Sequence, residues 1–494
     1  MSSAATALSI VAATLAVALG VGIIGGRRAL PKPEDFLVAG RSMGALLLWL
    51  LLGGEIYTAF TFLGAAGWAY GKGAPVYYVL CYGPVAYIIA YFTIPFVWNV
   101  AKKYGMITIG DFFAVRFQSR ELGAFVSIIG FIFLIPYITL QMNGLQLLLG
   151  IAGYGSIDSQ IAVIVAVLVI AVFVFFTGLR GTAWTSIVKD AVVLAAVLFA
   201  GIALPIHFFG SPAAVIERVA QIRPGWLTIP RSGGGFDMTW FITTVILNGI
   251  AFFMFPQTFM SLLSAKSSGA LRRNYIFLPL YSILIVMMII AGFTALLVVP
   301  GLVGPDADKS SVLAIARFYP PWVLGLIAGA GCLSALVPVC VQLLGASGLV
   351  AKNLFADALG WPTTERARTA VTRALVLVLA AGAIVLWATL KTTLVELLLV
   401  AYNGMAQFLP GASAALWSRR ATAPGIAAGI AVGIAFVVWA AARQVPALFG
   451  INIGLIALAV NMAVAFAVSA ISSPPPQADV EAFQAAALQD QASI

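Results

Sequence analysis

Residues 49–64 read WLLLGGEIYTAFTFLG, which is apolar enough to cross a membrane, yet a glycine pair, a glutamate, a tyrosine and two threonines lie at the centre. A charged side chain at mid-bilayer costs about 2.5–3.5 kcal/mol even on insertion scales. Irregular backbone at that depth is tolerated only where it is buried in protein or lines a cavity. The stretch therefore predicts a broken transmembrane helix beside a functional site, with Glu55 as a functional side chain.

The composition places the whole chain in the membrane. Its 494 residues are 62% hydrophobic and 9% charged, with a mean hydropathy of +1.06. This predicts an all-α polytopic membrane protein. One histidine and three cysteines are too few for a Cys/His metal cluster or a disulfide framework, so we expect no cofactor. The net charge of +10 comes without a basic array interleaved with aromatic residues, so we expect no nucleic-acid partner.

Segments of about 20 apolar residues mark the expected spans. Thirteen qualify: about 4–25, 44–69, 75–99, 122–151, 158–177, 183–209, 239–263, 276–300, 321–349, 369–390, 392–417, 423–442 and 449–471. The first is longer than a signal-peptide core and lacks a cleavage pattern, so we expect it to be retained.

The distribution of lysine and arginine predicts the orientation. If the loops alternate sides, one set holds 18 of these residues and the other holds 8. The positive-inside rule places the richer set in the cytoplasm, with the N-terminus outside and the tail 472–494 inside. We expect a short amphipathic helix at 211–221 in the long outer loop, and a tail that is a solvated helix or disordered.

Two predicted spans carry breaks at matching places. The first is 44–69, and the second is 239–263, where Asn248-Gly249 and Pro256-Gln257-Thr258 interrupt the apolar run. With the first helix set aside, these become helices one and six, separated by one five-helix half. Such a pair indicates an inverted-repeat transporter with a site at mid-membrane. The predicted parts are an extra helix and loop at 1–43, a ten-helix core at 44–417, two peripheral helices at 418–471 and the tail.

Other polar groups lie inside predicted spans. Lys189 and Asp190 are adjacent, and adjacent residues do not face each other on a helix, whereas Ser186 and Lys189 share one face. The alternative is that Lys189 and Asp190 lie near the cytoplasmic end and extend to water. Polar residues around Pro136 and Tyr402 are expected to interrupt spans 122–151 and 392–417, although such groups often only bond a neighbouring helix.

Several longer patterns carry a resemblance to a known family. The patterns are FLVAGRSMG, ITIGDFFAVRFQSREL, GLRGTAWTSIVKDAVVL and PQTFMSLLSAKSSGALRRN. In this order and spacing the chain resembles the sodium/solute symporter family over residues 4–471, which implies a LeuT-like fold of two inverted five-helix repeats with one extra helix before and two after. The segments closest to bacterial monocarboxylate permeases are GGEIYTAFTF, IPYITLQMNG, FMFPQTF and ALVPVCVQLLGASGLVAKNLF.

The resemblance implies a sodium site that this sequence does not reproduce. In the family, carbonyls at the break of core helix one join two hydroxyls from core helix eight, and the hydroxyl positions are Val337 and Pro338 here. Ser186 stands where many members carry an acid. We therefore expect proton coupling through Lys189 or Glu55, with Ser186 beside them. If sodium is retained instead, its ligands would be Gly54, Tyr57 and Ser334.

A small organic anion fits the same architecture, because broken helices present positive amide ends at mid-membrane. The expected substrate-binding residues are Tyr57, Thr58, Thr61, Gln141, Asn143, Phe252, Phe253, Gln257 and Tyr402.

The leading interpretation is a secondary transporter that imports a small monocarboxylate of the lactate, pyruvate or acetate type with protons. The alternatives are a sodium-coupled symporter of an amino acid or other small organic solute, and a transporter-like sensor. We expect a monomer in a bacterial-type inner membrane, in contact with the lipid bilayer. The sequence offers no hydrolytic constellation around His207, so we do not expect an enzyme.

Overall fold

The computed structural model describes residues 2–27, 32–230, 236–361, 364–388 and 393–489. Helices make up almost all of this part of the chain, and the strands β1 (Ala447–Leu448) and β2 (Ile451–Asn452) form a small antiparallel hairpin. The first half contains α1 (Ser3–Gly26), α2 (Pro33–Leu37), α3 (Ala45–Ile56), α4 (Ala65–Gly71), α5 (Tyr78–Tyr104), α6 (Ile109–Phe117), α7 (Arg120–Ala152), α8 (Ser159–Leu198), α9 (Leu204–Phe209) and α10 (Pro212–Ile222).

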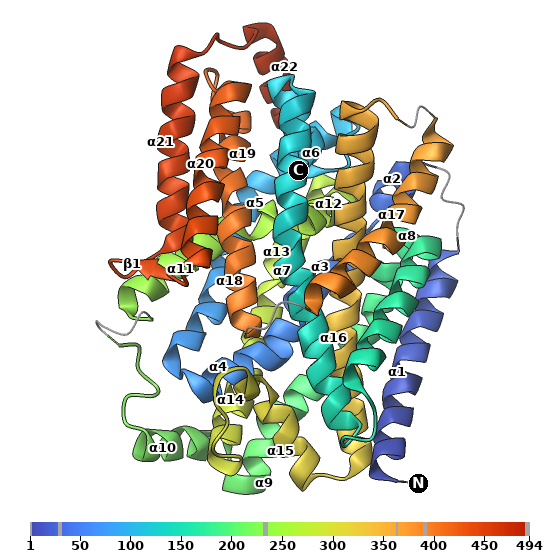
Figure 1. Ribbon diagram of the computed structural model, residues 1–494, viewed down its shortest axis with the longest axis vertical. Coiled ribbons are helices and arrows are strands. Elements are labelled where there is room, and N and C mark those ends of the chain that lie inside the picture. The colour runs from blue at the N-terminus through green and yellow to red at the C-terminus, as the bar shows by residue number, and fades with distance from the viewer. Residues whose placement is uncertain (1, 28–31, 231–235, 362–363, 389–392, 490–494) are drawn as a thin grey trace.

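The second half runs from the next long helix to the C-terminus, and Figure 1 shows it closely packed with the first. It contains α11 (Met238–Ala251), α12 (Pro256–Leu263), α13 (Ser268–Phe277), α14 (Pro279–Val298), α15 (Ser310–Phe318), α16 (Pro321–Gly348), α17 (Glu365–Trp387), α18 (Leu394–Met405), α19 (Leu409–Trp417), α20 (Ala423–Ala442), α21 (Ile453–Ile471) and α22 (Gln477–Leu488).

In the described residues, nine helices are long and apolar enough to cross a membrane, or up to eleven if each bent pair counts as one span. The predicted number of 13 is therefore not confirmed. One continuous segment, Ser159–Phe209, contains two of the predicted spans. Two helices meet inside it at Gly178, where φ is 57° and ψ is −157°. This backbone conformation is open to glycine because it has no Cβ.

Both predicted broken helices are confirmed. The axis bends by 51° between α3 and the segment Phe60–Gly71, and by 53° between the segment Met238–Met254 and α12. At the second break Phe255 has φ −65° and ψ 129°, an extended conformation between two helical ones. By contrast, the expected interruption of 122–151 is wrong, because α7 continues through Pro136. A proline removes one backbone hydrogen bond, and packing against neighbouring helices can keep the helix intact.

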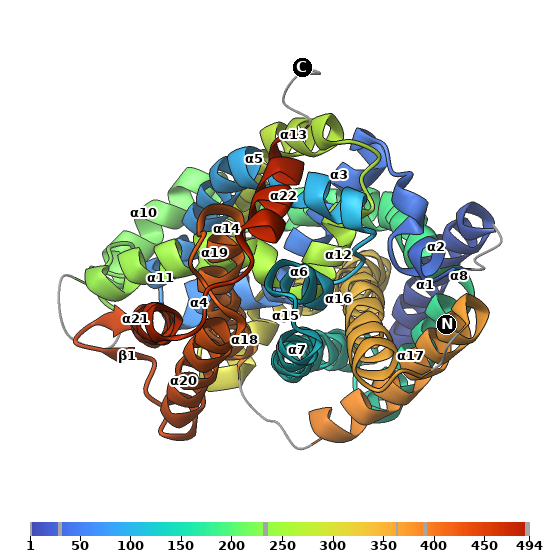
Figure 2. The same ribbon diagram turned by 90° about the horizontal axis from the view of Figure 1, so that it is seen from above.

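Helix α16 lies at the centre of the molecule, and almost all of its residues are buried (Figures 1 and 2). The helix α1 packs against both α8 and α16. Small residues make this approach possible: a Cβ on Gly22 would lie 2.1 Å from Thr185 Oγ1, and a Cβ on Gly325 would lie 2.8 Å from the Ala7 carbonyl oxygen. This packing buries one face of α8, and Lys189 lies among its buried residues.

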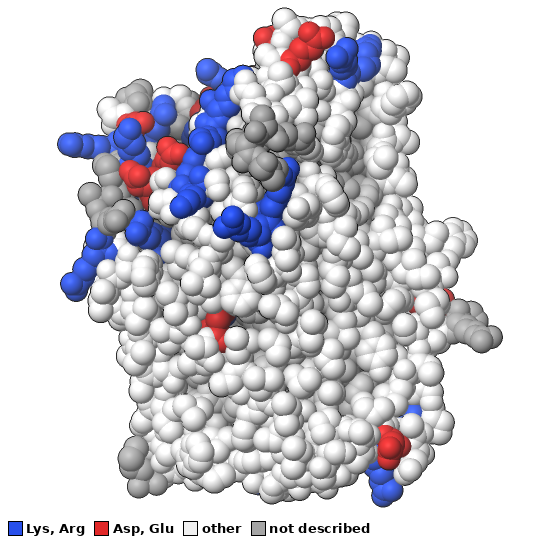
Figure 3. Space-filling view, turned by 180° about the vertical axis from the view of Figure 1, so that it is seen from behind, with Lys and Arg blue, Asp and Glu red and all other residues white. Residues whose placement is uncertain are grey.

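Lysine and arginine side chains gather at the end of the molecule where α22 lies, as Figure 3 shows. The short helix predicted at 211–221 is confirmed as α10. The tail prediction needs correction, because α22 is not simply solvated. Phe483 of α22 is 2% exposed, and Asn99 Nδ2 of α5 donates to the Ala487 carbonyl oxygen at 3.0 Å. The apolar face of α22 therefore packs against the protein, next to α5.

Candidate functional site

The glycine pair before the first break allows two side chains to approach α3. A Cβ on Gly53 would lie 2.3 Å from the Tyr281 ring, and a Cβ on Gly54 would lie 2.6 Å from Lys189 Nζ. The helix continues past both glycines to Ile56, and the helical path is lost at Tyr57. The sequence had suggested that the glycine pair forms the break. The structure shows that it does not, because the helix continues through both glycines. They make room for Tyr281 and Lys189 beside the break.

Lys189 reaches the break directly. Its side chain is 0% exposed, and Nζ donates to the Gly54 carbonyl oxygen at 2.7 Å. The same Nζ lies 3.1 Å from Asp190 Oδ1. The expectation that these neighbours cannot meet is wrong, because the long lysine side chain reaches the adjacent carboxylate. The alternative in which both extend to water is wrong as well, since both are buried.

Tyr281 of α14 completes this cluster. Its hydroxyl donates to Asp190 Oδ2 at 3.0 Å, and its carbonyl oxygen accepts from the Tyr57 hydroxyl at 3.0 Å. A buried ion pair is tolerated when further hydrogen bonds satisfy its remaining atoms. The cluster thus links the first broken helix, α8 and α14 through one buried ammonium and one buried carboxylate. No sequence signal identified Tyr281 as a partner.

Glu55 takes its hydrogen bonds from the second broken helix. Thr258 Oγ1 donates to Glu55 Oε2 at 2.6 Å, and Ser261 Oγ donates to Oε1 at 2.7 Å. Lys189 Nζ donates to the carbonyl oxygen of Gly54, the residue directly before Glu55. The structure therefore brings Glu55 and Lys189 to the same region, each with its own hydrogen-bond partners.

The residues proposed for a sodium ion are mostly engaged within the protein. Ser334 Oγ donates to the Ala330 carbonyl oxygen at 3.1 Å, within its own helix. Ser186, which was expected beside the proton carriers, lies next to Gly54. Its Oγ donates to the Thr182 carbonyl oxygen at 3.2 Å, also within its own helix. Val337 and Pro338 are buried in α16 and offer no side-chain oxygen. The Gly54 carbonyl oxygen, one of the expected sodium ligands, already accepts a hydrogen bond from the Lys189 ammonium.

Two buried amide groups near the breaks have an unused polar atom. Gln141 Oε1 of α7 accepts from the Ala59 backbone N–H at 3.0 Å, whereas Gln141 Nε2 has no partner in the described part of the chain. Gln257 Oε1, at the start of α12, also lacks one among these residues. Buried polar groups are nearly always paired, so such atoms are candidates for contact with a bound solute.

Other expected substrate residues bond the protein itself. Thr61 Oγ1 donates to the Ile56 carbonyl oxygen, and Asn143 Oδ1 accepts from Trp387 Nε1 of α17 at 2.8 Å. Asn143 is therefore turned toward α17 and away from the other candidates. Thr58 is buried at the first break.

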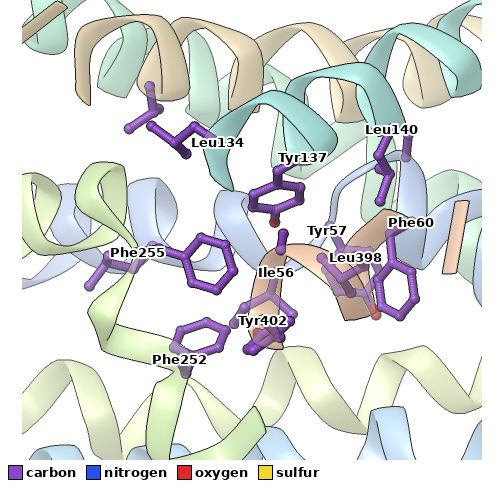
Figure 4. Close-up of a cluster of buried hydrophobic side chains, with 14 of the residues drawn as sticks. Ile56, Tyr57, Phe60, Leu134, Tyr137, Leu140, Phe252, Phe255, Leu398 and Tyr402 are labelled. Carbon is purple, nitrogen blue, oxygen red and sulfur yellow. The ribbon is translucent and has the colours of Figure 1, made fainter. Parts of the chain in front are cut away.

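Aromatic rings pack around Ile56, where Figure 4 shows Tyr137, Phe252, Phe255 and Tyr402. The Phe255 ring centroid lies 4.9 Å from that of Tyr402 and 5.4 Å from that of Tyr137. Phe252 and Tyr402 were expected here, and Tyr137 and Phe255 were not assigned. Tyr137 follows Pro136 and Phe255 precedes Pro256, and both prolines had been noted in the sequence.

Phe253 lies at the edge of this aromatic group, with its ring centroid 4.9 Å from that of Phe252. Its ring contacts Tyr275 of α13 at a centroid distance of 5.4 Å. Helix α12 begins with Pro256 at its first turn, so its first free N–H groups lie at this break. Such a helix start attracts negative charge. Amide groups, a positive helix end and an aromatic wall can together hold a small carboxylate with an apolar tail.

A buried acid outside the predicted spans packs against the first broken helix at α4. Asp308, between α14 and α15, is 3% exposed, and its Oδ2 accepts from the Leu394 backbone N–H at the start of α18 at 3.2 Å. Burial raises the pKa of Asp308 to about 7. A Cβ on Gly67 of α4 would lie 2.2 Å from Asp308 Oδ1, so this glycine lets the acid pack directly on the helix.

Comparison with known proteins assigns this architecture to transporters. The profile of the sodium:solute symporter family matches residues 36–433. The chain is 37% identical to the uncharacterized symporter YhjB of Bacillus subtilis, over 94% of this chain and 96% of that protein. It is 28% identical to a monocarboxylate transport permease protein of Rhizobium johnstonii, over 91% of this chain and 92% of that protein.

The fold also matches a solved transporter. A Na+-coupled sialic acid symporter in a substrate-bound, outward-open state superposes with a TM-score of 0.81 at 16% identity, covering 96% of this chain and 99% of that one. At this identity the likeness concerns the fold, and the fold is the LeuT-like one expected from the sequence.

Proposed function

Because the chain belongs to the sodium:solute symporter family, whose members are multi-pass membrane transporters of small solutes, we propose that it imports a small monocarboxylate together with protons. Import proceeds by alternating access to the space between the two broken helices. Of the two charged candidates, we assign the transported proton to Lys189, with Ser186 beside it, whereas Glu55 is held by two hydroxyls of α12.

One observation carries the proposal of proton coupling. Lys189 Nζ lies 2.7 Å from the Gly54 carbonyl oxygen, the position at which the resemblance places part of a sodium site. Val337 and Pro338 remove the hydroxyl ligands of that site. A tethered ammonium can fill the position of the cation, and it can pass its proton to water when the site opens. Sodium has no such proton to release.

Gln141, Gln257 and the start of α12 support an anionic substrate. The unpaired Gln141 Nε2 is a donor, and the helix start adds N–H groups of the same polarity. The walls from Phe252, Phe255 and Tyr402 suit a short apolar tail. The Rhizobium johnstonii relative, named for monocarboxylate transport, agrees with this chemistry.

Sodium coupling is the second candidate, and the printed name of the family favours it. In that case, the carbonyls of Gly54 and Tyr57 and the hydroxyl of Ser334 would supply oxygen ligands. Lys189 would then have to leave the Gly54 carbonyl before sodium could bind, since a second cation beside an ammonium is repelled.

The membrane arrangement follows from the same reasoning. We place the basic end seen in Figure 3 in the cytoplasm, with the N-terminus outside and α22 inside. This gives a ten-helix core at 44–417 in a bacterial inner membrane, with 1–43 before it and 418–471 after it. We propose that one copy is sufficient for transport.

Uptake by proteoliposomes tests this function. Pyruvate, lactate, acetate and proline are offered separately, with a pH gradient and a sodium gradient imposed in separate experiments. We expect a pH gradient without sodium to drive the uptake of a monocarboxylate, and Lys189→Ala to abolish it. Strict dependence on sodium would contradict proton coupling, and uptake of proline alone would contradict the substrate class.

A further inference from the structure

Glu55 joins two helices that are far apart in the sequence. It is the second-last residue of α3, and it is 7% exposed. Both carboxylate oxygens are bound by hydroxyls of α12, from Thr258 at 2.6 Å and from Ser261 at 2.7 Å. Residues three apart lie on one face of a helix, so Thr258 and Ser261 present a matched pair of groups to this carboxylate.

The same two helices are also joined at their other ends. Met43, just before α3, pairs with Ala265, just after α12, in an isolated parallel bridge. The Met43 backbone N–H donates to the Ser264 carbonyl oxygen at 3.0 Å, and the Lys266 N–H donates to the Met43 carbonyl oxygen at 2.9 Å. Helices α3 and α12 are therefore linked at both ends by directional hydrogen bonds.

Each of these helices ends at a break on the side of the site. Helix α3 stops at Ile56, before the bend of 51°, and α12 starts at Pro256, after the bend of 53°. A bend in the backbone permits rotation of one half against the other. The links at Glu55 and Met43 oppose separate rotation of α3 and α12.

We propose that Glu55 is a positioning residue that clamps α3 to α12, so that these two half-helices turn as one body during transport. The inference rests on the transport activity of the family, and not on the solute or the coupling ion proposed above. The clamp needs two hydrogen-bonding groups at residue 55 that match Thr258 and Ser261, and a negative charge there is not required.

The hydrogen count at Ser261 shows which side chains can replace Glu55. Ser261 Oγ lies 2.9 Å from the Gln257 carbonyl oxygen as well as 2.7 Å from Glu55 Oε1. A hydroxyl has one hydrogen to donate and can also accept. In Glu55→Gln, the new amide can donate to Ser261 Oγ while Ser261 donates to Gln257, and the amide oxygen can accept from Thr258. In Glu55→Ala, both links are lost.

The first experiment measures uptake per folded transporter, counted after size-exclusion chromatography. We expect Glu55→Gln to retain uptake, and Glu55→Ala to lower the maximal rate about tenfold or more without a matching change in KM. The double variant Thr258→Val/Ser261→Ala should reproduce that loss. Loss in Glu55→Gln as severe as in Glu55→Ala, with uptake retained in the double variant, would overturn the clamp and assign Glu55 to charge transfer.

A second experiment joins the helices covalently. Met43→Cys/Ala265→Cys is made in a background whose Cys81, Cys332 and Cys340 are alanine, and each single cysteine variant serves as the control. If the half-helices turn together, uptake is the same in oxidised and reduced vesicles. If they must separate, oxidation abolishes uptake and a reductant restores it, which would refute the proposal.

A thermal double-mutant cycle in detergent needs no solute. The clamp predicts that adding Thr258→Val/Ser261→Ala to Glu55→Ala lowers the melting temperature no further, because the contact is already lost. Fully additive losses would mean that the hydroxyls and Glu55 do not act as a unit. Failure of the unmodified protein to transport any monocarboxylate would count against the proposed substrate, and this cycle would still decide the clamp.

Discussion

Following the orientation proposed above, we call α3 and α12 the inner halves of the two broken helices and α4 and α11 the outer halves. The two pairs are held together by different forces. On the inner side, α3 and α12 share hydrogen bonds at Glu55 and at Met43. On the outer side, α4 and α11 meet through aromatic rings, with the Trp68 and Trp240 centroids 5.9 Å apart. Hydrogen bonds require a particular geometry, whereas contacts between apolar rings tolerate displacement.

This difference assigns distinct tasks to the two sides. The inner pair can transmit a change at one break to the other because its contacts fix distance and direction. We expect the outer pair to slide more easily, although Asp308 packs on α4 and accepts a hydrogen bond from the start of α18.

The largest effect is expected for Lys189→Met. It leaves Asp190 buried without its cation, and removing one partner of a buried ion pair costs about 3–5 kcal/mol. We expect a large drop in thermal stability together with the loss of gradient-driven uptake. The double variant Lys189→Met/Asp190→Asn should regain stability in a melting assay without regaining uptake. Recovery of gradient-driven uptake in the double variant would contradict a role for the ammonium.

Gly53→Ala should have the next largest effect. Its Cβ would lie 2.3 Å from the Tyr281 ring, and overpacking of this kind costs about 1–3 kcal/mol. Displacing Tyr281 also disturbs its hydrogen bond to Asp190, so uptake should fall. Gly44→Ala is the matched control at the start of the same helix, where a Cβ meets nothing within 4 Å. Equal uptake by the two variants would argue against the close approach of Tyr281.

Asp308→Asn tests the outer side through pH. Burial raises the pKa of Asp308 to about 7, above its value in the unfolded chain, so the folded state holds this proton more tightly. The wild-type protein therefore loses stability as pH rises through about 7, and asparagine removes that loss. We expect the variant to melt at a higher temperature than wild type near pH 8, and the difference to shrink near pH 5. A difference independent of pH would contradict the assignment.

Trp240→Phe should have the smallest effect. The Trp240 ring is fully buried, and its Nε1 has no hydrogen-bond partner in the described part of the chain. Phenylalanine loses some apolar area but also removes an unpaired N–H, so stability should change by less than about 1.5 kcal/mol. Uptake should persist. A loss of uptake comparable to that of Gly53→Ala would show that the outer contact is as exacting as the inner one.

The sequence alone determined the class of the protein and the places where its helices break. Long apolar runs specify membrane helices because lipid excludes unpaired backbone, and the polar interruptions in 44–69 and 239–263 stand out against those runs. The same pattern failed at Pro136, because one missing backbone hydrogen bond does not break a helix that its neighbours support.

Which buried groups meet depends on the packing of helices that are distant in the chain. Glu55 and Lys189 were both singled out, but their partners Thr258, Ser261 and Tyr281 come from helices distant in the chain. The contact between Lys189 and Asp190 depends on side-chain conformation, which helical spacing does not specify. Hydropathy records how much each segment avoids water. The pairing of buried polar atoms depends on how the segments pack, and a one-dimensional pattern does not contain that information.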